Sequence, residues 1–229
     1  MRILLQTKEL SKIYGTGENA VRALNQCNLS FEEGSFTSVV GRSGSGKSTL
    51  MHLLGGLDMP TTGSVEIEGR DIYKLSDSER TIFRRRRVGF VFQAYNLMPE
   101  LTAYQNILLP IQLDNRKVDK DYLQEIISML GLEDRLSHYP GELSGGQQQR
   151  VAIARALITK PAVVFADEPT GNLDGKSGAE VLELLHLSRK RLNQTLVLVT
   201  HDRQIAEGAD RIITLEDGNI SGDTGRSAV

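Results

Sequence analysis

The chain has 229 residues, 39% of them hydrophobic and 24% charged, which is enough for one substantial core with a smaller subdomain. A formal net charge of −2 gives no support for bulk binding to nucleic acid. The single cysteine, Cys27, excludes an intramolecular disulfide and suits a reducing cytoplasm. No apolar run is as long as a membrane helix, and the N-terminus lacks the apolar core of a signal peptide. We therefore expect any membrane contact to be made only through a partner chain.

The N-terminal part of the chain is predicted to consist of short strands separated by turns. Ile3–Leu5, Val21–Leu24 and Leu29–Phe31 are β-prone segments. Tyr14 lies between the first two of them and precedes a glycine-containing turn. Its ring is either a stacking surface for a nucleotide base or a half-buried strand tyrosine, and its position leaves both open.

The sequence GRSGSGKST at 41–49 joins an apolar strand, Phe36–Val40, to an amphipathic helix. This is the context of a phosphate-binding loop, because glycines let backbone N–H groups converge on an anion at a helix N-terminus. Lys47 supplies charge for the β- and γ-phosphates, and the Ser48 hydroxyl is placed to bind Mg²⁺. A tight glycine turn without a ligand is the alternative. We expect a nucleoside triphosphate to contact Gly41, Arg42, Ser43, Gly44, Ser45, Gly46, Lys47, Ser48 and Thr49. The predicted apolar face of the helix consists of Leu50, Leu53, Leu54 and Leu57.

A strand at Ser64–Ile67 and a helix at Ser76–Arg87 are predicted next. The helix ends in four arginines, which suggest a nucleic-acid or lipid contact but are more simply explained as a solvated, cationic helix end. Val88–Phe92 is the following strand and places Gln93 at its end. An amide there is either a ligand for an ion or water, or an ordinary loop residue.

Residues 94–160 are predicted to form a mostly helical insertion in an α/β core. Tyr122–Leu130 is an amphipathic helix that stops at Gly131. The apolar segment 94–112, interrupted by prolines, is either plain core or a docking groove for a partner helix.

The sequence LSGGQ, Leu143–Gln147, marks another predicted helix N-terminus. Ser144 and Gln147 have the spacing of a capping box. Ser144 and Gly146 are therefore expected at a second position that favours an anion. An ordinary capped helix is the alternative when this stretch is considered alone.

Two apolar strands in the C-terminal third end in polar residues. Ala162–Ala166 is followed by Asp167, which suits Mg²⁺ through water, and by Glu168, a candidate to orient or deprotonate an attacking water. Thr195–Val199 is followed by His201, which is placed to contact the γ-phosphate. The remaining histidines lie in helical or loop patterns and are expected to be surface or core residues.

Taken in order, these motifs resemble the nucleotide-binding subunit of an ABC transporter. The resemblance rests on the loop at 41–49, Gln93, LSGGQ at Leu143–Gln147, the run ending at Glu168, and His201. It covers the chain apart from the tail and implies an ATP hydrolase that uses ATP and Mg²⁺.

The resemblance also implies a role for each motif residue. Tyr14 would stack on adenine, and Gln93 would bind Mg²⁺ and water and report on the membrane partner. Glu168 would be the catalytic carboxylate, and His201 the γ-phosphate switch. The implied magnesium ligands are Ser48, Gln93 and Asp167.

The implied partners are a second copy of this chain and a separate transmembrane permease. Ser144 and Gly146 would contact the γ-phosphate of ATP bound to the opposite protomer, and Asp174 would lie in the loop that crosses between protomers. Two chains would thus meet head to tail around two ATP molecules, in a closed dimer that ATP favours and ADP does not. The subunit would lie peripherally on the cytoplasmic face of the membrane.

Three segments resemble a narrower group, the macrolide-exporter, lipoprotein-release and antimicrobial-peptide-resistance class. They are GENAVRAL after Tyr14, GFVFQ at Gly89–Gln93 and PTGNLD at Pro169–Asp174. Asn172-Leu173 departs from the more widespread Ala-Leu form of the crossing loop but agrees with this group. Its permeases act by export or by mechanotransmission. A soluble ABC-type ATPase acting on DNA or ribosomes, or a regulatory subunit, is the alternative.

The predicted fold is a P-loop α/β core with a mostly parallel sheet and an N-terminal antiparallel β part. Residues 1–93 and 161–229 would form this core, and about 94–160 the helical subdomain within a single ATPase domain. The chain is predicted to close with a hairpin over 212–220 and a frayed tail at 222–229.

Overall fold

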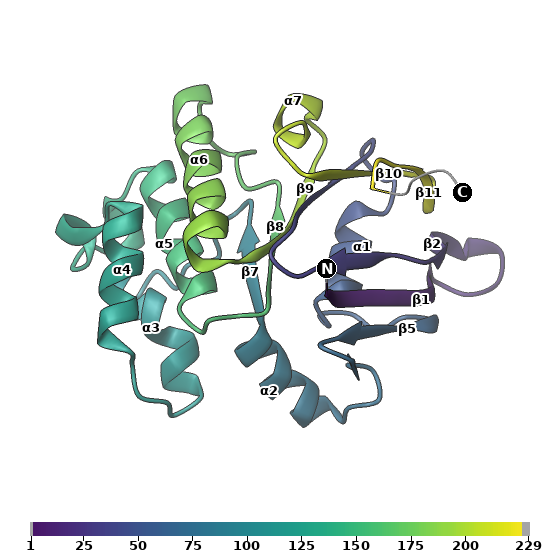
Figure 1. Cartoon of the computed structure of the whole chain (residues 1–229), viewed down its shortest axis with the longest axis horizontal. Coiled ribbons are helices and arrows are strands. Elements are labelled where there is room, and N and C mark those ends of the chain that lie inside the picture. Colours follow the sequence, from purple (N-terminus) through teal and green to yellow (C-terminus); the bar gives the residue numbers. More distant parts are fainter. Residues whose placement is uncertain (1, 226–229) are drawn as a thin grey trace. The chain divides into compact units, whose positions relative to one another are not determined.

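The computed structural model describes residues 2–225, and the chain packs as two compact units. One unit combines Met1–Arg84 with Thr195–Val229, and the other is Arg85–Gln194 (Figure 1). The predicted division of the chain near residues 94 and 160 stays a prediction, because packing units and functional subdomains need not coincide.

The first unit contains an antiparallel sheet of N-terminal strands, drawn in purple and blue in Figure 1. The strands are β1 (Ile3–Tyr14), β2 (Val21–Cys27), β3 (Ser30–Glu32), β5 (Thr62–Ile67) and β6 (Arg70–Asp71). Their order is β2-β1-β5-β6, and β3 also pairs with β1. In β5, Val65 and Ile67 are fully buried, whereas Glu66 between them pairs with Lys8 at 2.9 Å. This alternation is what a sheet with one covered face requires.

The same unit holds a second group of strands that leads to the phosphate loop. They are β4 (Phe36–Val40), β9 (Thr195–Thr200), β10 (Arg211–Glu216) and β11 (Asn219–Asp223). Strands β10, β4 and β9 run parallel, and every residue of β4 and β9 is buried, as in a strand covered on both faces. The turn Asp217–Gly218, with φ of +46° and +77°, joins β10 to antiparallel β11 and confirms the predicted hairpin. The predicted tail is wrong at residues 222–223, which belong to β11; residues 226–229 lie outside the described part.

Short helices accompany these strands. They are α1 (Lys47–Leu54), α7 (Arg203–Ala206) and the 3₁₀ turn η1 (Gly17–Asn19). Helix α1 contacts β2 and β9 and buries Leu50, Leu53 and Leu54. It ends at Leu54, with Gly55 as its C-cap, so Leu57 lies beyond the helix and is 42% exposed; its predicted place on the buried face is wrong. The helix α2 (Asp77–Arg87) buries none of its residues.

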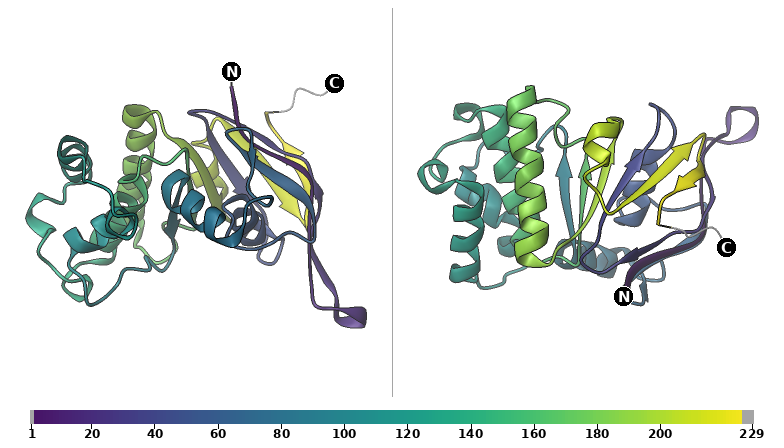
Figure 2. Two further views of the ribbon diagram at one scale, coloured as in Figure 1. Left: turned by 90° about the horizontal axis from the view of Figure 1, so that it is seen from below. Right: turned by 45° about the horizontal axis from the view of Figure 1, so that its top comes forward.

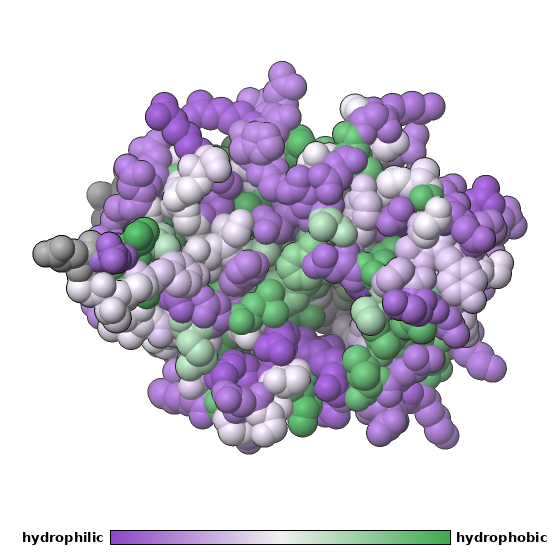
Figure 3. All heavy atoms as spheres, turned by 180° about the vertical axis from the view of Figure 1, so that it is seen from behind, coloured by the Kyte–Doolittle hydropathy of each residue, from purple (hydrophilic) through white to green (hydrophobic). Residues whose placement is uncertain are grey.

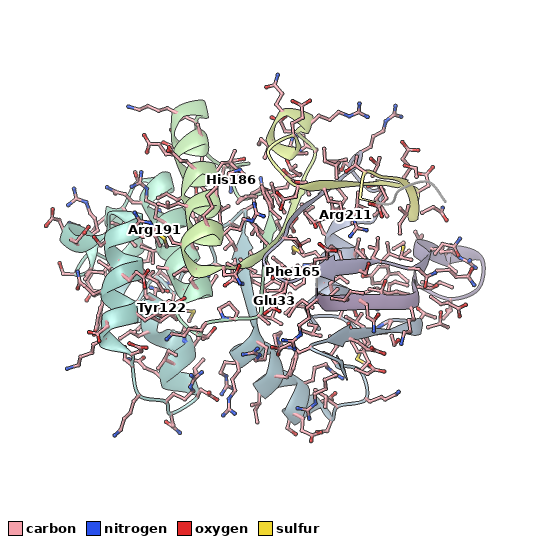
Figure 4. All side chains as sticks on the ribbon, viewed as in Figure 1. Glu33, Tyr122, Phe165, His186, Arg191 and Arg211 are labelled. Atoms are coloured by element: carbon pink, nitrogen blue, oxygen red, sulfur yellow. The ribbon has the colours of Figure 1, made fainter. Side chains whose placement is uncertain are left out.

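The second unit packs four helices around a parallel strand pair. Its elements are β7 (Val88–Phe92), β8 (Val163–Asp167), α3 (Ala103–Leu113), α4 (Lys120–Leu130), α5 (Gly145–Leu157), α6 (Gly175–Leu192) and the 3₁₀ turns η2 (Glu133–Arg135) and η3 (Pro140–Glu142). Helix α5 contacts β7, α3, α4 and α6 and is the centre of the unit. Helix α6 is the long light-green helix in Figure 2. Phe165 of β8 stacks on Phe90 of β7 with ring centroids 5.7 Å apart (Figure 4). On α4, burial raises the pKa of Tyr122 to about 12, and its hydroxyl donates to the Leu157 carbonyl. Helices over a parallel pair, together with the antiparallel N-terminal part, confirm the predicted α/β fold.

The arginines at the end of α2 form more hydrogen bonds to neighbouring residues than expected for a solvated helix end. Arg84 donates to the Gly56 carbonyl at 2.8 Å. Arg86 forms a two-pronged pair with Asp114, at 2.8 and 3.1 Å. The side-chain hydrogen bond from Arg86 lowers the pKa of Asp114. The arginine run therefore fixes the end of α2 to its neighbours.

Hydrophobic residues reach the face in Figure 3 in small groups separated by hydrophilic ones. Among the described residues, Val21 and Leu113 are the most exposed large hydrophobic side chains, at 64% and 61%. None of the helices within residues 2–225 combines the length and the apolar character needed to cross a bilayer.

Candidate nucleotide-binding site

The phosphate loop follows β4 and has the close-packed backbone that its glycines predict. A Cβ on Gly46, whose φ is +101°, would lie 2.3 Å from the Ala23 carbonyl oxygen. A Cβ on Gly41 would lie 2.3 Å from the Leu215 carbonyl oxygen. The backbone can therefore reach this conformation only with glycine at both positions.

Lys47 is folded back over the loop. Its side chain is buried, and Nζ donates to the carbonyl oxygens of Gly41 and Arg42, each at 2.9 Å. This places a full positive charge at the N-terminus of α1, where the helix dipole is also positive. Arg42, Ser43, Gly44 and Ser48 are exposed around that charge. The loop thus presents the electrostatics that a polyphosphate requires.

The turn between β10 and β11 is hydrogen-bonded to the phosphate loop, a contact that was not predicted from the sequence. The Gly218 N–H donates to the Ser45 carbonyl at 3.0 Å, and the Gly218 carbonyl accepts from the Asn25 N–H at 2.9 Å. A Cβ on Gly218 would come within 2.9 Å of the Ala23 carbonyl oxygen. The Asp-Gly turn therefore stabilises the phosphate loop as well as the hairpin.

Tyr14 lies at the end of β1 with its ring 42% exposed. Its hydroxyl donates to Asp58 at 2.8 Å, and the Lys12 ammonium sits 4.7 Å from the ring centroid. Partial burial and the bond to Asp58 raise the pKa of the Tyr14 hydroxyl. Although partial burial opposes it, the hydrogen bonds from Lys12 and Tyr14 lower the pKa of Asp58. The ring is therefore held in one orientation, and its stacking on adenine stays a prediction.

His201 directly follows β9 and is exposed. The next residue, Asp202, is the N-cap of α7 and accepts from the Gln204 N–H at 2.8 Å. The contact of His201 with the γ-phosphate stays a prediction.

In the second unit, β7 and β8 end side by side, because Phe92 is in register with Asp167. Gln93 and Glu168 are the next residues on these two strands. Glu168 has a left-handed φ of +44°, a backbone conformation that is strained for a side chain of this size. Gln93 forms two hydrogen bonds with Asn172, each of 3.0 Å.

A buried glutamine ties these two strand ends together. Gln149 of α5 is fully buried, and its Nε2 donates to the carbonyl oxygens of Phe92 and Pro169, at 3.3 and 2.8 Å. The helix that begins with LSGGQ thus holds both strand ends directly. Gln149 was not predicted as a site residue, and its place on the buried face of α5 was the one signal available.

The predicted capping box at LSGGQ is confirmed. Ser144 Oγ accepts from the Gln147 N–H at 3.3 Å, and Gln147 Oε1 accepts from the Ser144 N–H at 2.9 Å. Ser144 and Gly146 line a polar pocket of about 280 Å³. The other lining residues are Gly131, Glu133, Asp134, Arg135, Gln147, Arg150, Ser177 and Glu180.

Asp174 caps α6, a helix that the sequence analysis did not predict. Its carboxylate accepts from the N–H groups of Lys176 and Ser177, at 3.1 and 3.0 Å, and from the Ser177 hydroxyl at 2.7 Å. These hydrogen bonds lower the pKa of Asp174, and the bond from the Ser177 N–H has the largest effect. Ser177 also lines the pocket, so helix α6, which Asp174 caps, and the LSGGQ helix both contribute residues to its wall.

The donors predicted for Mg²⁺ are a hydroxyl on Ser48, an amide on Gln93 and a carboxylate on Asp167. All three offer oxygen, which is the ligand type that Mg²⁺ prefers. Within residues 2–225, no cluster of three or more His, Cys, Asp or Glu side chains could hold a metal by itself. This donor set fits a Mg²⁺ ion that is held mainly by nucleotide phosphates and water, and does not fit an all-protein cage.

The parallel strands, the glycine loop and the lysine over the α1 N-terminus define a P-loop protein that binds nucleoside triphosphates. A family model described as ABC transporter matches residues 24–171, and the chain belongs to this family. The chain is 49% identical over 224 residues to an uncharacterized ABC transporter ATP-binding protein of Methanocaldococcus jannaschii, covering 95% of this chain and 97% of that protein. It is 45% identical over 225 residues to the lipoprotein-releasing system ATP-binding protein LolD of Geobacter metallireducens, covering 97% of this chain and all of LolD.

Two further comparisons extend the likeness. The macrolide export ATP-binding/permease protein MacB of Bdellovibrio bacteriovorus is 45% identical over 223 residues, which are 96% of this chain and 34% of MacB. The ATP-binding cassette MJ0796, solved as a dimer in a post-hydrolysis state bound to ADP and Pi, matches with a TM-score of 0.88 and 41% identity, over 99% of this chain and all of that chain. These relatives agree with the narrower group that the sequence motifs predicted.

Proposed function

We propose that this chain is the ATP-hydrolysing motor subunit of an ABC transporter and drives a separate membrane permease of the export or mechanotransmission type. The observation that carries the proposal is that the chain has two helix N-termini built for phosphate. One follows the phosphate loop with Lys47, and the other begins at Ser144 beside a polar pocket. These two helix N-termini lie in different packing units.

Nucleotide binding begins with the phosphate loop. Its backbone N–H groups and Lys47 hold the β- and γ-phosphates, and Tyr14 supplies an exposed ring for the adenine. Ser48, Gln93 and Asp167 would hold Mg²⁺, which supplies charge neutralisation on the phosphates when bound. Side chains of the protein carry out the remaining steps.

Glu168 orients the attacking water and accepts its proton, and His201 contacts the γ-phosphate. Glu168 directly follows β8 in a strained left-handed backbone conformation, and such strain is concentrated at functional sites, which supports this role. Ser144 and Gly146 bind the γ-phosphate of ATP on the opposite protomer, and Asp174 lies at the crossing loop. Because that phosphate is shared between two chains, ATP stabilises the closed head-to-tail dimer and ADP does not.

The permease would contact the segment that follows Gln93. This segment is divided: Ile107 and Leu108 are buried core, whereas Met98 and Tyr104 are 48% and 41% exposed. The exposed part supports docking of a partner helix, which would keep the subunit on the cytoplasmic face of the membrane. Tyr104→Glu should weaken complex formation with the permease and leave basal ATPase activity unchanged; an intact complex would contradict this docking surface.

The test of the hydrolytic role is the variant Glu168→Gln. It retains the shape of the site and loses the base, so turnover should fall by about 10²–10⁴-fold while ATP binding persists. Turnover at the wild-type rate would contradict the proposal. Loss of ATP binding in the same variant would instead show that Glu168 has a structural role.

A further inference from the structure

The crossing loop and Gln93 are joined by a reciprocal pair of hydrogen bonds within the second unit. Gln93 Nε2 donates to Asn172 Oδ1, and Asn172 Nδ2 donates to the backbone carbonyl of Gln93, both at 3.0 Å. The two residues are 79 positions apart in the chain. Both side chains are exposed, so the pair is accessible to ligands and contributes little to the core.

This pair determines which way the Gln93 amide faces. A backbone carbonyl only accepts, so the nitrogen of Asn172 must face the carbonyl of Gln93. The Asn172 oxygen is then turned toward the Gln93 side chain, which must meet it with its nitrogen. Oε1 is thereby left as the outward acceptor, and no hydrogen bond from another residue of the described chain reaches it. An oxygen is the atom that a Mg²⁺ ligand needs.

Gly171 packs against the same amide. A Cβ at this position would lie 2.6 Å from Gln93 Nε2 and 2.9 Å from Cδ. The φ of Gly171 lies outside the left-handed region, so the backbone does not require glycine here. The Gln93 side chain lies close to this position, so a methyl group here would displace its terminal amide.

The backbone on either side of the pair is held by side-chain hydrogen bonds. Gln149 holds the carbonyls of Phe92 and Pro169, which precede the two paired segments. On the far side of Gln93, Arg155 is half-buried and donates to the carbonyls of Tyr95 and Asn96, at 2.8 and 2.5 Å. The short loop after β7 is thus fixed at both ends, and the Gln93 side chain is set by Asn172 and Gly171.

We propose that Asn172 and Gly171 are positioning residues that present Gln93 Oε1 as an Mg²⁺ ligand, so that the crossing loop controls metal binding within its own chain. The proposal rests on the proposed function, because it assumes that Gln93 meets a nucleotide-bound metal. It gives a specific purpose to asparagine where the widespread form of this loop has alanine.

The test measures nucleotide binding and does not depend on turnover. In the Glu168→Gln protein, the affinity for a fluorescent ATP analogue is measured with excess Mg²⁺ and again with EDTA. Asn172→Ala should reduce the gain in affinity that Mg²⁺ provides by about tenfold and leave the affinity in EDTA unchanged. Gly171→Ala should do the same, because its methyl group displaces the Gln93 amide.

The matched control is Asn28→Ala. Asn28 is also exposed, accepts from the Glu9 N–H at 2.9 Å and donates to the Gln26 carbonyl at 3.0 Å, in the other unit. This variant should leave both affinities unchanged. In a Gln93→Ala background, Asn172→Ala should have no further effect on the Mg²⁺ dependence.

Equal losses of affinity with Mg²⁺ and with EDTA would overturn the proposal in favour of a structural role for Asn172. A full tenfold loss in the Gln93→Ala background would overturn it as well, because Asn172 would then act without Gln93. Failure of the proposed function is a separate result: the parent Glu168→Gln protein would bind no ATP in either condition.

Discussion

Replacing Gln149 by methionine tests whether the LSGGQ helix holds the strand ends that carry the catalytic residues. The change keeps the length of the side chain and removes its polar atoms. It leaves the Pro169 carbonyl without its Nε2 donor, which costs about 1–3 kcal/mol. The Phe92 carbonyl also loses the Nε2 donor but keeps the Tyr95 N–H at 3.2 Å, so this second loss costs about 0.5–1.5 kcal/mol. Gln149 Oε1 is buried with no partner among the described residues, so its removal recovers about 1–3 kcal/mol. The net loss in free energy of unfolding is therefore about 0.5–1.5 kcal/mol.

Urea unfolding followed by circular dichroism measures this difference. The matched control is Gln148→Met, since Gln148 is half-buried and donates to one carbonyl, that of Leu143, at 3.1 Å. We expect the control to lose less than about 0.5 kcal/mol, because water can replace the donor at this half-buried position. Turnover should fall further in Gln149→Met than in Gln148→Met, because Gln93 and Glu168 follow the released strand ends. Equal unfolding midpoints for the two variants would refute the role of Gln149.

Three further predictions concern other parts of the chain. Gly46→Ala should abolish ATP binding measured by titration calorimetry, because its methyl group would collide with a backbone carbonyl; binding within threefold of the parent would contradict this. Tyr14→Ala should weaken ATP binding by about tenfold and Tyr14→Phe by less than threefold, since the ring and not its bond to Asp58 does the stacking. Because its folded pKa lies below the ordinary 3.8, Asp114 should stabilise the fold above pH 4 and lose this contribution as the pH falls through the lower folded value. Asp114→Asn, which weakens the pair with Arg86, should flatten that part of the pH–stability curve; an unchanged curve would show that the pair contributes nothing.

Local patterns predicted most of the elements, because strands and helix caps depend on neighbours in sequence. The strands Phe36–Val40 and Val88–Phe92 were predicted with their observed bounds, and the capping box at Ser144 is confirmed. Helix α6 was missed because the PTGNLD motif before it was interpreted for function, although Asp174 is a good N-cap. Helix α3 lies in the segment predicted to be mostly helical, but it continues through Pro110 to Leu113, where the proline predicts an interruption.

Contacts between segments that are far apart in the chain could not be predicted from the sequence. The pair of Gln93 with Asn172 and the bonds of Gln149 join segments that only the folded chain brings together. The same holds for Gly218, whose bond to Ser45 connects the last hairpin to the phosphate loop. The motif residues could be listed in advance, whereas the residues that position them required the structure.

Sedimentation of the purified chain and of Glu168→Gln, each with Mg²⁺ and excess ATP or ADP, tests the central claim most directly. A motor that closes around shared ATP predicts a Glu168→Gln dimer with ATP and a monomer with ADP, because the variant cannot convert one state into the other. A Glu168→Gln protein that binds ATP and sediments as a monomer at all concentrations would contradict the account.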